Sequence, residues 1–279
     1  MRSIAVINQK GGVGKTTTAV NLSAALAAEG HRVWLIDMDP QAHASLHLGL
    51  VPEKGQATIY DVLTEHATIR EARYQLTDTL WLTPSHIDLA AAELELGGEV
   101  GREILLRERL LDEAKEFDFV LLDCPPSLGI LTLNALTAVR EVLLPMQPHF
   151  LALHGLSKLL HTIEIVGKRL NRHLRLSGVV FCMCDNQTRL ANEVISDVHE
   201  FFATAANERS AWLGARCFQA RIRRNVRLAE APSFGRSIFE YAPQSHGAED
   251  YRKLAAELND IGQAASTPTQ EDRLSRIAG

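Results

Sequence analysis

The sequence predicts an α/β fold with a doubly wound, mostly parallel sheet flanked by helices. Short apolar runs recur along the chain as nearly continuous stretches, a pattern that is typical of strands covered on both faces. Stretches with apolar residues at helical spacing separate these runs, which indicates repeated strand–helix–strand units. The chain has 279 residues, of which 46% are hydrophobic, so it can bury the core of one large domain.

The elements follow in chain order. Residues 17–29 are rich in Ala and Leu and predict a helix, and Gly30 directly after them is typical of a helix end. Residues 49–75 contain Pro, Gly and scattered charge, which favours loops and short helices near the functional site. We expect one domain over residues 1–262 and a flexible, polar C-terminal tail over residues 263–279. The expected strands are residues 4–8, 32–37, 119–123, 142–145 and 176–183.

Composition excludes several classes of protein. The net charge of −5 argues against a protein that coats nucleic acid over its whole surface, although a local basic patch is compatible with it. We find no apolar run long enough to span a membrane and no signal peptide, so we expect a cytoplasmic protein. Buried, reduced thiols are expected because no metal-site spacing connects the four cysteines, which are Cys124, Cys182, Cys184 and Cys217.

The strongest functional signal is the glycine-rich segment KGGVGKTT, which follows an expected strand and opens an expected helix. Glycines permit positive φ angles and close backbone approach, and successive N–H groups at a helix start attract anions. The segment therefore predicts a nucleotide-phosphate cradle, in which Lys15 reaches the β- and γ-phosphates and the Thr16 hydroxyl binds Mg²⁺. The cradle residues are Lys10, Gly11, Gly12, Val13, Gly14, Lys15, Thr16 and Thr17.

The segment has Lys10 where the ordinary pattern has its first glycine, and in this it resembles the deviant Walker A loop of the ParA/MinD superfamily of P-loop ATPases. Residues 37–41 (DMDPQ) resemble the first switch of that family, and residues 119–127 (FVLLDCPPS) resemble its Walker B segment and second switch. Residues 225–235 (NVRLAEAPSFG) are similar to the C-terminal signature of chromosomal ParA proteins, also called Soj. The resemblance covers about residues 2–260 and implies an ATPase that uses ATP and Mg²⁺, slow alone and stimulated by a partner.

The resemblance also implies roles for single residues. Lys10 would reach the phosphates of a partner subunit in an ATP-bound homodimer, so that hydrolysis depends on dimerisation. Lys15 and Asp39 would be catalytic with it, Asp39 by orienting the attacking water. Thr16, Asp39 and Asp123 would lie at the metal ion.

Two residues are implied to lie beside the adenine, Arg223 and Asn225. The family has proline at the position of Arg223, and a planar guanidinium can stack on a base in its place. Base recognition is therefore expected to differ in detail from the family pattern.

A dense basic stretch places five arginines within residues 216–227. Together with the resemblance, this stretch implies salt-sensitive binding of nonspecific double-stranded DNA in the ATP state. The resemblance further implies a nucleoid-associated location and segregation of chromosomes or plasmids with a ParB-like partner. At the position of the family's DNA-linked arginine this chain has Gln187. A solvated arginine face without a ligand is the alternative interpretation. The candidate DNA contacts are Arg189, Arg221, Arg224 and Arg227.

Other functions are known on the same fold and make different demands on the sequence. A MinD-like membrane-associated positioning ATPase needs a C-terminal amphipathic helix with bulky apolar residues. The tail after residue 262 has Leu274 and Ile277 but neither Trp nor Phe, so we expect no stable membrane association. An iron–sulfur reductase would need a second suitable cysteine beside Cys124, and a metabolic ligase is a further alternative. A ParA-like ATPase that positions a protein cargo stays open.

Overall fold

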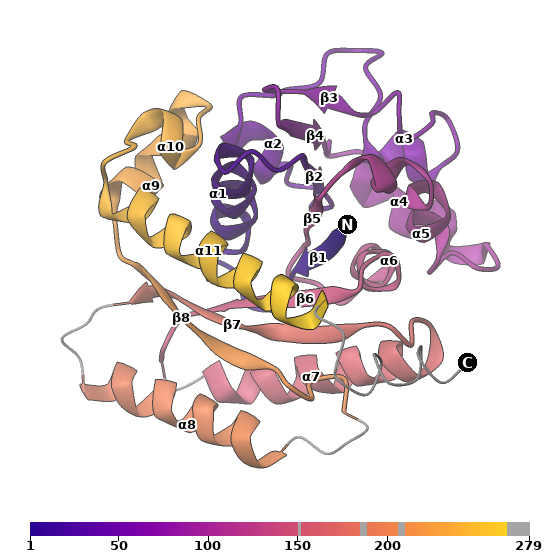
Figure 1. Cartoon of the computed structure of the whole chain (residues 1–279). Helices are drawn as coiled ribbons and strands as arrows, with labels where there is room; N and C mark the ends of the chain where they lie inside the picture. The colour runs from indigo at the N-terminus through magenta and orange to yellow at the C-terminus, as the bar shows by residue number, and fades with distance from the viewer. Residues whose placement is uncertain (150–151, 185–188, 206–209, 267–279) are drawn as a thin grey trace, which may run out of the picture.

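The computed structural model describes residues 1–149, 152–184, 189–205 and 210–266. Over these residues the chain forms one eight-stranded sheet with the order β3-β4-β2-β5-β1-β6-β7-β8 (Figure 1). All neighbouring strands are parallel except β3 and β4, which are antiparallel. The predicted doubly wound, mostly parallel sheet is therefore confirmed. Its strands are β1 (Arg2–Val6), β2 (Val33–Asp37), β3 (Tyr74–Gln75), β4 (Leu80–Thr83), β5 (Phe119–Asp123), β6 (Glu141–Met146), β7 (Arg175–Cys184) and β8 (Arg216–Arg223).

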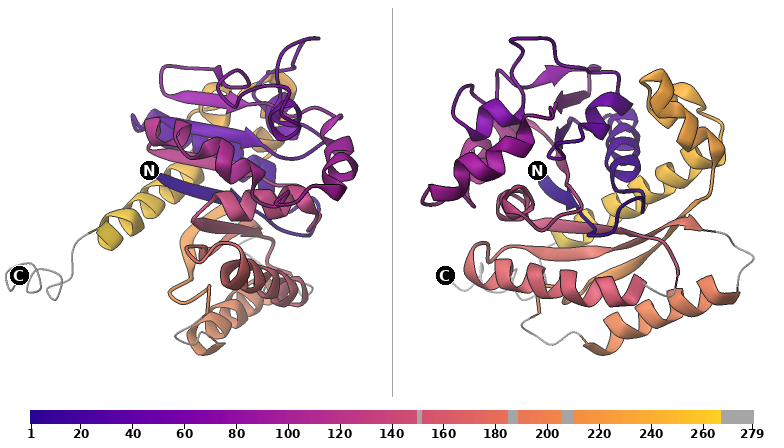
Figure 2. Two further views of the ribbon diagram at one scale, coloured as in Figure 1. Left: turned by 90° about the vertical axis from the view of Figure 1, so that its right-hand side faces the viewer. Right: turned by 180° about the vertical axis from the view of Figure 1, so that it is seen from behind.

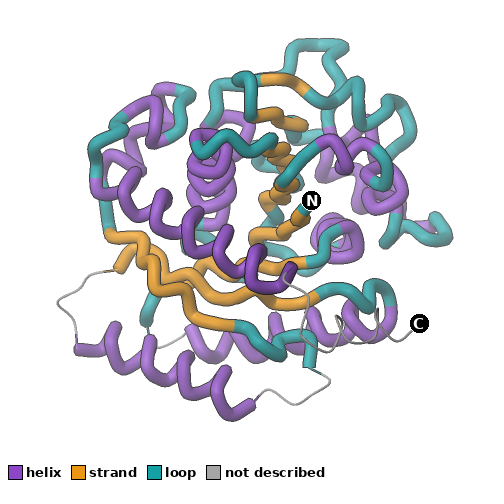
Figure 3. The backbone as a smooth tube through the Cα atoms, viewed as in Figure 1, coloured by secondary structure: helices purple, strands orange, loops and turns teal. Residues whose placement is uncertain are grey.

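Helices cover both faces of the sheet, as the tube and the rotated views show (Figures 2 and 3). One apolar core lies between the strands and α1, α2, α10 and α11, and the other lies between the strands and α3 to α8. The helices are α1 (Lys15–Ala28), α2 (His43–His47), α3 (Ile59–Leu63), α4 (Leu89–Glu95), α5 (Leu105–Leu110), α6 (Ile130–Ala138), α7 (Ala152–Arg169), α8 (Arg189–Ala205), α9 (Val226–Glu230), α10 (Ile238–Tyr241) and α11 (His246–Ser266), with 3₁₀ turns η1 (Leu96–Gly98), η2 (Glu113–Glu116) and η3 (Ala231–Phe234).

The strand interiors explain the continuous apolar runs. Every residue of β2 and of β5 is buried, because each strand has helices on both of its faces. α1 ends as expected, with Gly30 in the left-handed region (φ 90°) directly after its last turn. The parallel arrangement brings the carboxyl ends of the strands to one edge, where ligands bind in sheets of this kind.

The C-terminal part of the described chain is the helix α11, which packs against β8 and α1. It runs to Ser266 and so continues past residue 262, the predicted domain boundary. Residues 267–279, which make up most of the predicted tail, lie outside the described residues. Within the described part of the chain, no helix is both long and apolar enough to cross a bilayer.

Candidate nucleotide-binding site

The glycine-rich loop joins the end of β1 to the start of α1. Gly12 and Gly14 have φ angles of 71° and 95°, a region that favours glycine. Gly14 is the N-cap residue of α1 and offers no side chain to the first N–H groups of the helix, which leaves them available to an anion. The loop has the backbone geometry of a phosphate cradle.

Two side-chain hydrogen bonds connect this loop to β6 and to the segment that follows β6. The Asn8 amide donates a hydrogen bond to the carbonyl of Pro145 at 2.7 Å. The Gln147 amide donates to the carbonyl of Gly12 at 3.1 Å. Lys15 is buried, and its Nζ donates to the carbonyl of Lys10 at 3.1 Å, so it folds back over the loop. No role for Gln147 could be predicted from the sequence, because its partner Gly12 lies 135 residues away along the chain.

Strand register brings the predicted acidic residues together beside the loop. Asp37 at the end of β2 pairs with Asp123 at the end of β5, and Val6 at the end of β1 pairs with the same aspartate. The backbone N–H of Asp39 donates to Asp37 Oδ1 at 3.2 Å, which holds the third carboxylate close by. Asp37 and Asp39 of the first-switch segment and Asp123 of the Walker B segment therefore lie at one edge of the sheet.

Burial shifts the pKa values of this cluster. Burial raises the pKa of Asp123 well above its usual range, with repulsion from Asp37 adding to the effect and the Thr16 hydroxyl and Lys15 opposing it. Burial also raises the pKa of Asp37 to about 6, against hydrogen bonds from Ser45. The pKa of Lys15 is lowered by burial, although Asp123 and Asp39 favour its charged form.

The cluster fits a divalent cation. Both carboxylate oxygens of Asp123 are buried and lack a hydrogen-bond partner of good geometry among the described residues. Carboxylate and hydroxyl oxygens, here those of Asp123 and Thr16, are ligands that Mg²⁺ accepts. Within the described residues, no group of three or more His, Cys, Asp or Glu side chains is arranged to hold a metal alone. A cation here would take its remaining ligands from phosphates and water, as Mg²⁺ commonly does.

A second part of the site is a cavity of about 200 Å³ beside the start of α1. Arg223 lies in its wall, where its guanidinium donates to Asp250 at 2.6 and 3.0 Å and to Glu249 at 2.9 Å. Asn225 caps α9 by accepting the N–H of Arg227 at 2.8 Å, which leaves its amide NH₂ group available to a ligand. The cavity is lined by Gly14, Thr17, Cys182, Met183, Ile222, Arg223, Arg224, Asn225, Leu228, Ala229 and Tyr251.

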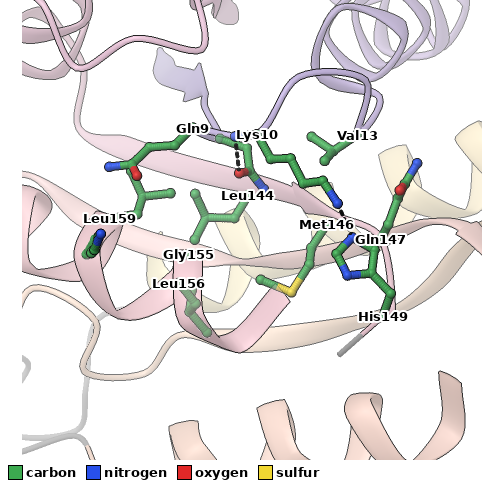
Figure 4. Close-up of a pocket in the computed structure, with 12 residues that line it drawn as sticks. Gln9, Lys10, Val13, Leu144, Met146, Gln147, His149, Gly155, Leu156 and Leu159 are labelled. Carbon is green, nitrogen blue, oxygen red and sulfur yellow. Dashed lines mark hydrogen bonds between the residues drawn. The ribbon is translucent and has the colours of Figure 1, made fainter. Parts of the chain in front are cut away.

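The other lysine of the loop, Lys10, is exposed and does not line this cavity. Its ammonium group contacts Nε2 of His149, over a second cavity of about 280 Å³ between the loop, β6 and α7 (Figure 4). Burial and the positive charge of Lys10 lower the pKa of His149, so the neutral imidazole can accept a hydrogen bond from Lys10. Within a single chain, Lys10 is therefore held by the segment that follows β6.

The candidate DNA-binding arginines are all exposed. Arg221 and Arg224 form no ion pair with any described residue, whereas Arg227 pairs with Glu230 at 2.8 Å. Arg189 is the first residue of α8, is 94% exposed and pairs with Glu193 at 3.1 Å. The start of α8 lies on the same side as the carboxyl ends of β7 and β8 (Figure 1). Gln187 lies outside the described residues.

The four cysteines are buried and form no disulfide, which agrees with the expected reduced thiols. Cys182 packs against the glycine-rich loop, where a Cβ on Gly14 would lie 3.5 Å from its Cβ atom. Burial raises the pKa of Cys182 to about 12, so its thiol is protonated and unreactive at neutral pH.

The sheet order and the loop define a P-loop nucleotide-binding protein, and a family model described as "AAA domain" matches residues 1–176. The chain is 43% identical to the Bacillus subtilis (strain 168) sporulation initiation inhibitor protein Soj over 256 residues, which cover 91% of this chain and 97% of that protein. It is 45% identical to the chromosome-partitioning ATPase Soj of Thermus thermophilus over 258 residues, which cover 92% and 95% of the two chains. The chain therefore belongs to the Soj/ParA family of chromosome-partitioning ATPases.

A solved structure agrees with this fold. The Mycobacterium smegmatis protein named cobyrinic acid a,c-diamide synthase, determined with a bound ATP analogue and magnesium, superposes with a TM-score of 0.79 at 34% sequence identity. The match covers 95% of this chain and 97% of that chain.

Proposed function

We propose that this chain is a dimerising ATPase that binds nonspecific double-stranded DNA in its ATP state and segregates chromosomes or plasmids with a ParB-like partner. The observation that carries the proposal is the position of the exposed arginines. Exposed Arg224 lines the same cavity as the loop glycine Gly14, beside the half-buried Arg223 and Asn225. These residues lead directly into α9, which carries the exposed Arg227. Nucleotide and DNA would thus contact neighbouring residues of one segment.

In this proposal the phosphates of ATP lie in the glycine-rich loop. The open N–H groups at the start of α1 and the Lys15 ammonium neutralise their charge. Thr16 and Asp123 would hold Mg²⁺, with Asp39 beside them, and the ion would neutralise charge that develops on the transferred phosphoryl group. Asp39 orients the attacking water, and the base lies in the cavity beside Arg223 and Asn225.

Dimerisation would complete this site. Lys10 is exposed, and its ammonium group is held only by His149 among the described residues, so it can be released to a second subunit. A lysine supplied by a partner makes hydrolysis slow in the single chain and faster in an assembled dimer. A ParB-like partner that favours the competent dimer would then stimulate turnover.

The test is binding to a random-sequence duplex at low salt without nucleotide, with ADP and with ATP. We expect binding only with ATP, and a steep loss of affinity as salt rises, because the arginines contact phosphates. Arg221→Ala should weaken DNA binding and reduce the salt slope by about one while leaving nucleotide affinity unchanged, because Arg221 is exposed and does not line the nucleotide cavity. Lys168→Ala, on the end of α7 and already paired with Glu164 at 2.6 Å, is the matched control.

The absence of DNA binding in all three nucleotide states would refute the DNA part of the proposal. Nucleotide-dependent binding to lipid vesicles would then favour a membrane-associated positioning ATPase, and binding to neither surface would favour a protein cargo. ATP consumption that neither DNA nor dimerisation affects would favour a metabolic role, such as the one in the name of the Mycobacterium smegmatis neighbour.

A further inference from the structure

The carboxylate of Asp37 is fully buried and already committed to partners inside the protein. Its Oδ2 accepts the backbone N–H of Ser45 at 2.9 Å and the Ser45 hydroxyl at 2.7 Å, while Oδ1 accepts the N–H of Asp39 at 3.2 Å. Asp123, its neighbour in the register, has no hydrogen-bond partner of good geometry in the described chain. The two carboxylates therefore differ in what they bind: the oxygens of Asp123 remain available to a ligand, whereas Asp37 holds the segment that follows it.

Ser45 is the residue that anchors Asp37. It lies in α2 and is 1% exposed. Its hydroxyl donates to Asp37 and accepts the N–H of Ser85 at 3.0 Å, so one oxygen links the segment after β4 to the end of β2. The hydroxyl is not a helix cap, because α2 begins after Ala42 and the hydrogen bonds of the hydroxyl run to other segments.

The chain of contacts ends on the Asp39 side chain. Asp37 holds the N–H of Asp39, and Asp39 Oδ1 accepts the N–H of Gln41 at 2.9 Å. Asp39 is only 8% exposed, so hydrogen bonds within the protein, more than contacts with water, set the orientation of its carboxylate. A displacement of about 1 Å in a group that orients a reactant can slow a reaction roughly 100-fold, so the anchor of this segment matters for rate.

We infer that Ser45 is a positioning residue for ATP hydrolysis, which acts through Asp37 to fix the backbone and carboxylate of Asp39. This inference rests on the proposed function, since it concerns the hydrolytic step of that site. The hydrogen bonds of the Ser45 hydroxyl run to Asp37 and Ser85 and not to the glycine-rich loop, so its loss should affect turnover more than nucleotide binding.

The test compares Ser45→Ala with the wild-type chain in steady-state ATP hydrolysis and in equilibrium binding of a fluorescent ATP analogue with Mg²⁺. We expect kcat to fall roughly 10-fold, as for loss of one buried hydrogen bond to a charged group. The dissociation constant for the analogue should change by less than about 3-fold. Ser45→Thr retains the hydroxyl and should recover most of the rate.

Ser23→Ala is the matched control. Ser23 is as buried as Ser45, lies in α1, and its hydroxyl has no hydrogen-bond partner among the described residues. The same substitution there should leave kcat unchanged. A wild-type kcat in Ser45→Ala, or equal losses in the two alanine variants, would overturn the inference.

A second measurement separates this inference from the proposed function. Amide hydrogen exchange of the nucleotide-free chain should quicken over residues 38–42 in Ser45→Ala and stay unchanged in Ser23→Ala. If the wild-type chain does not hydrolyse ATP, the proposed function fails, whereas unchanged exchange over residues 38–42 overturns the role of Ser45 whatever the activity.

Discussion

The close approach of two glycines gives the sharpest prediction about stability. Gly235 ends η3 with φ 62°, and a Cβ added there would lie 2.9 Å from Cα of Gly49, which follows α2. The neighbouring atom is backbone, so it cannot swing aside as the end of a side chain could. The contact joins the segment after Asp39 to the segment that carries the exposed arginines, and Gly235→Ala should disturb it.

Two effects add in Gly235→Ala. Placing a residue with a Cβ in the left-handed region lowers the free energy of unfolding by about 1 kcal/mol. The overpacked contact with Gly49 lowers it by about 2 kcal/mol more. The unfolding entropy of a 279-residue chain is roughly 0.6 kcal/mol per kelvin, so the total of about 3 kcal/mol lowers Tm by about 5 °C. Scanning calorimetry of the nucleotide-free protein measures this shift.

Gly55→Ala is the control for the first effect alone. Gly55 has φ 88°, but nothing lies within 4 Å of a Cβ built there. We expect its Tm to fall by about 2 °C. If Gly235→Ala lowers Tm no further than Gly55→Ala, the glycine–glycine contact does not constrain the fold, and the reasoning is refuted.

Two further predictions concern the acidic cluster. Asp123→Asn replaces a fully buried carboxylate, whose charged form burial and the neighbouring Asp37 disfavour, so it should raise the Tm of the nucleotide-free protein. It should also abolish the Mg²⁺-dependent part of the Tm increase with ADP, and a lower Tm without nucleotide would contradict this reasoning. Because burial raises the pKa of Asp37 from 3.8 to about 6, the folded state binds this proton more tightly than the unfolded state does. This residue should therefore stabilise the nucleotide-free chain as pH falls through 6 towards 4, by up to about 3 kcal/mol, measured as the difference between wild type and Asp37→Asn in urea unfolding at each pH. A difference that does not change with pH would contradict the assignment.

The sequence predicted the interior of the sheet better than its edges. β2 and β5 are buried along their whole length, so their apolar runs are continuous and easily recognised. β8 was not predicted, because it lies at the edge of the sheet and its buried residues are interrupted by exposed Arg216, Gln219 and Arg221. Its arginines suggest a basic patch instead of a strand. β3 has only two residues and depends on its pairing with β4.

In the candidate site, too, residues in local motifs could be predicted, whereas residues that depend on distant partners could not. Residues carried by local motifs, such as Lys15 and Asp123, could be named because each lies in a short recognisable pattern. Ser45 could not, because its function depends on hydrogen bonds to Asp37 and Ser85 that only the folded chain creates. The partners of Arg223 were hidden for the same reason, since Asp250 lies 27 residues further along the chain.

The two lysines of the glycine-rich loop have different surroundings, and mixing variants tests the role proposed for Lys10. Lys15 is buried against the acidic cluster, whereas Lys10 is exposed beside His149. Suppose that Lys10 serves the partner's site and Asp39 its own. A heterodimer of Lys10→Ala and Asp39→Ala then contains one complete site, formed by Asp39 of the first chain and Lys10 of the second.

Equal mixing should therefore restore up to about a quarter of the wild-type rate per chain, because half of the dimers are mixed and each has one of two sites active. Each variant alone should be inactive, and a mixture of Lys10→Ala with Lys10→Ala/Asp39→Ala should remain so. If Lys10 acts within its own chain, no mixture recovers activity, because every site then lacks either Lys10 or Asp39. The rate of the mixture thus decides whether the exposed lysine belongs to the site beside it or to the one across the dimer.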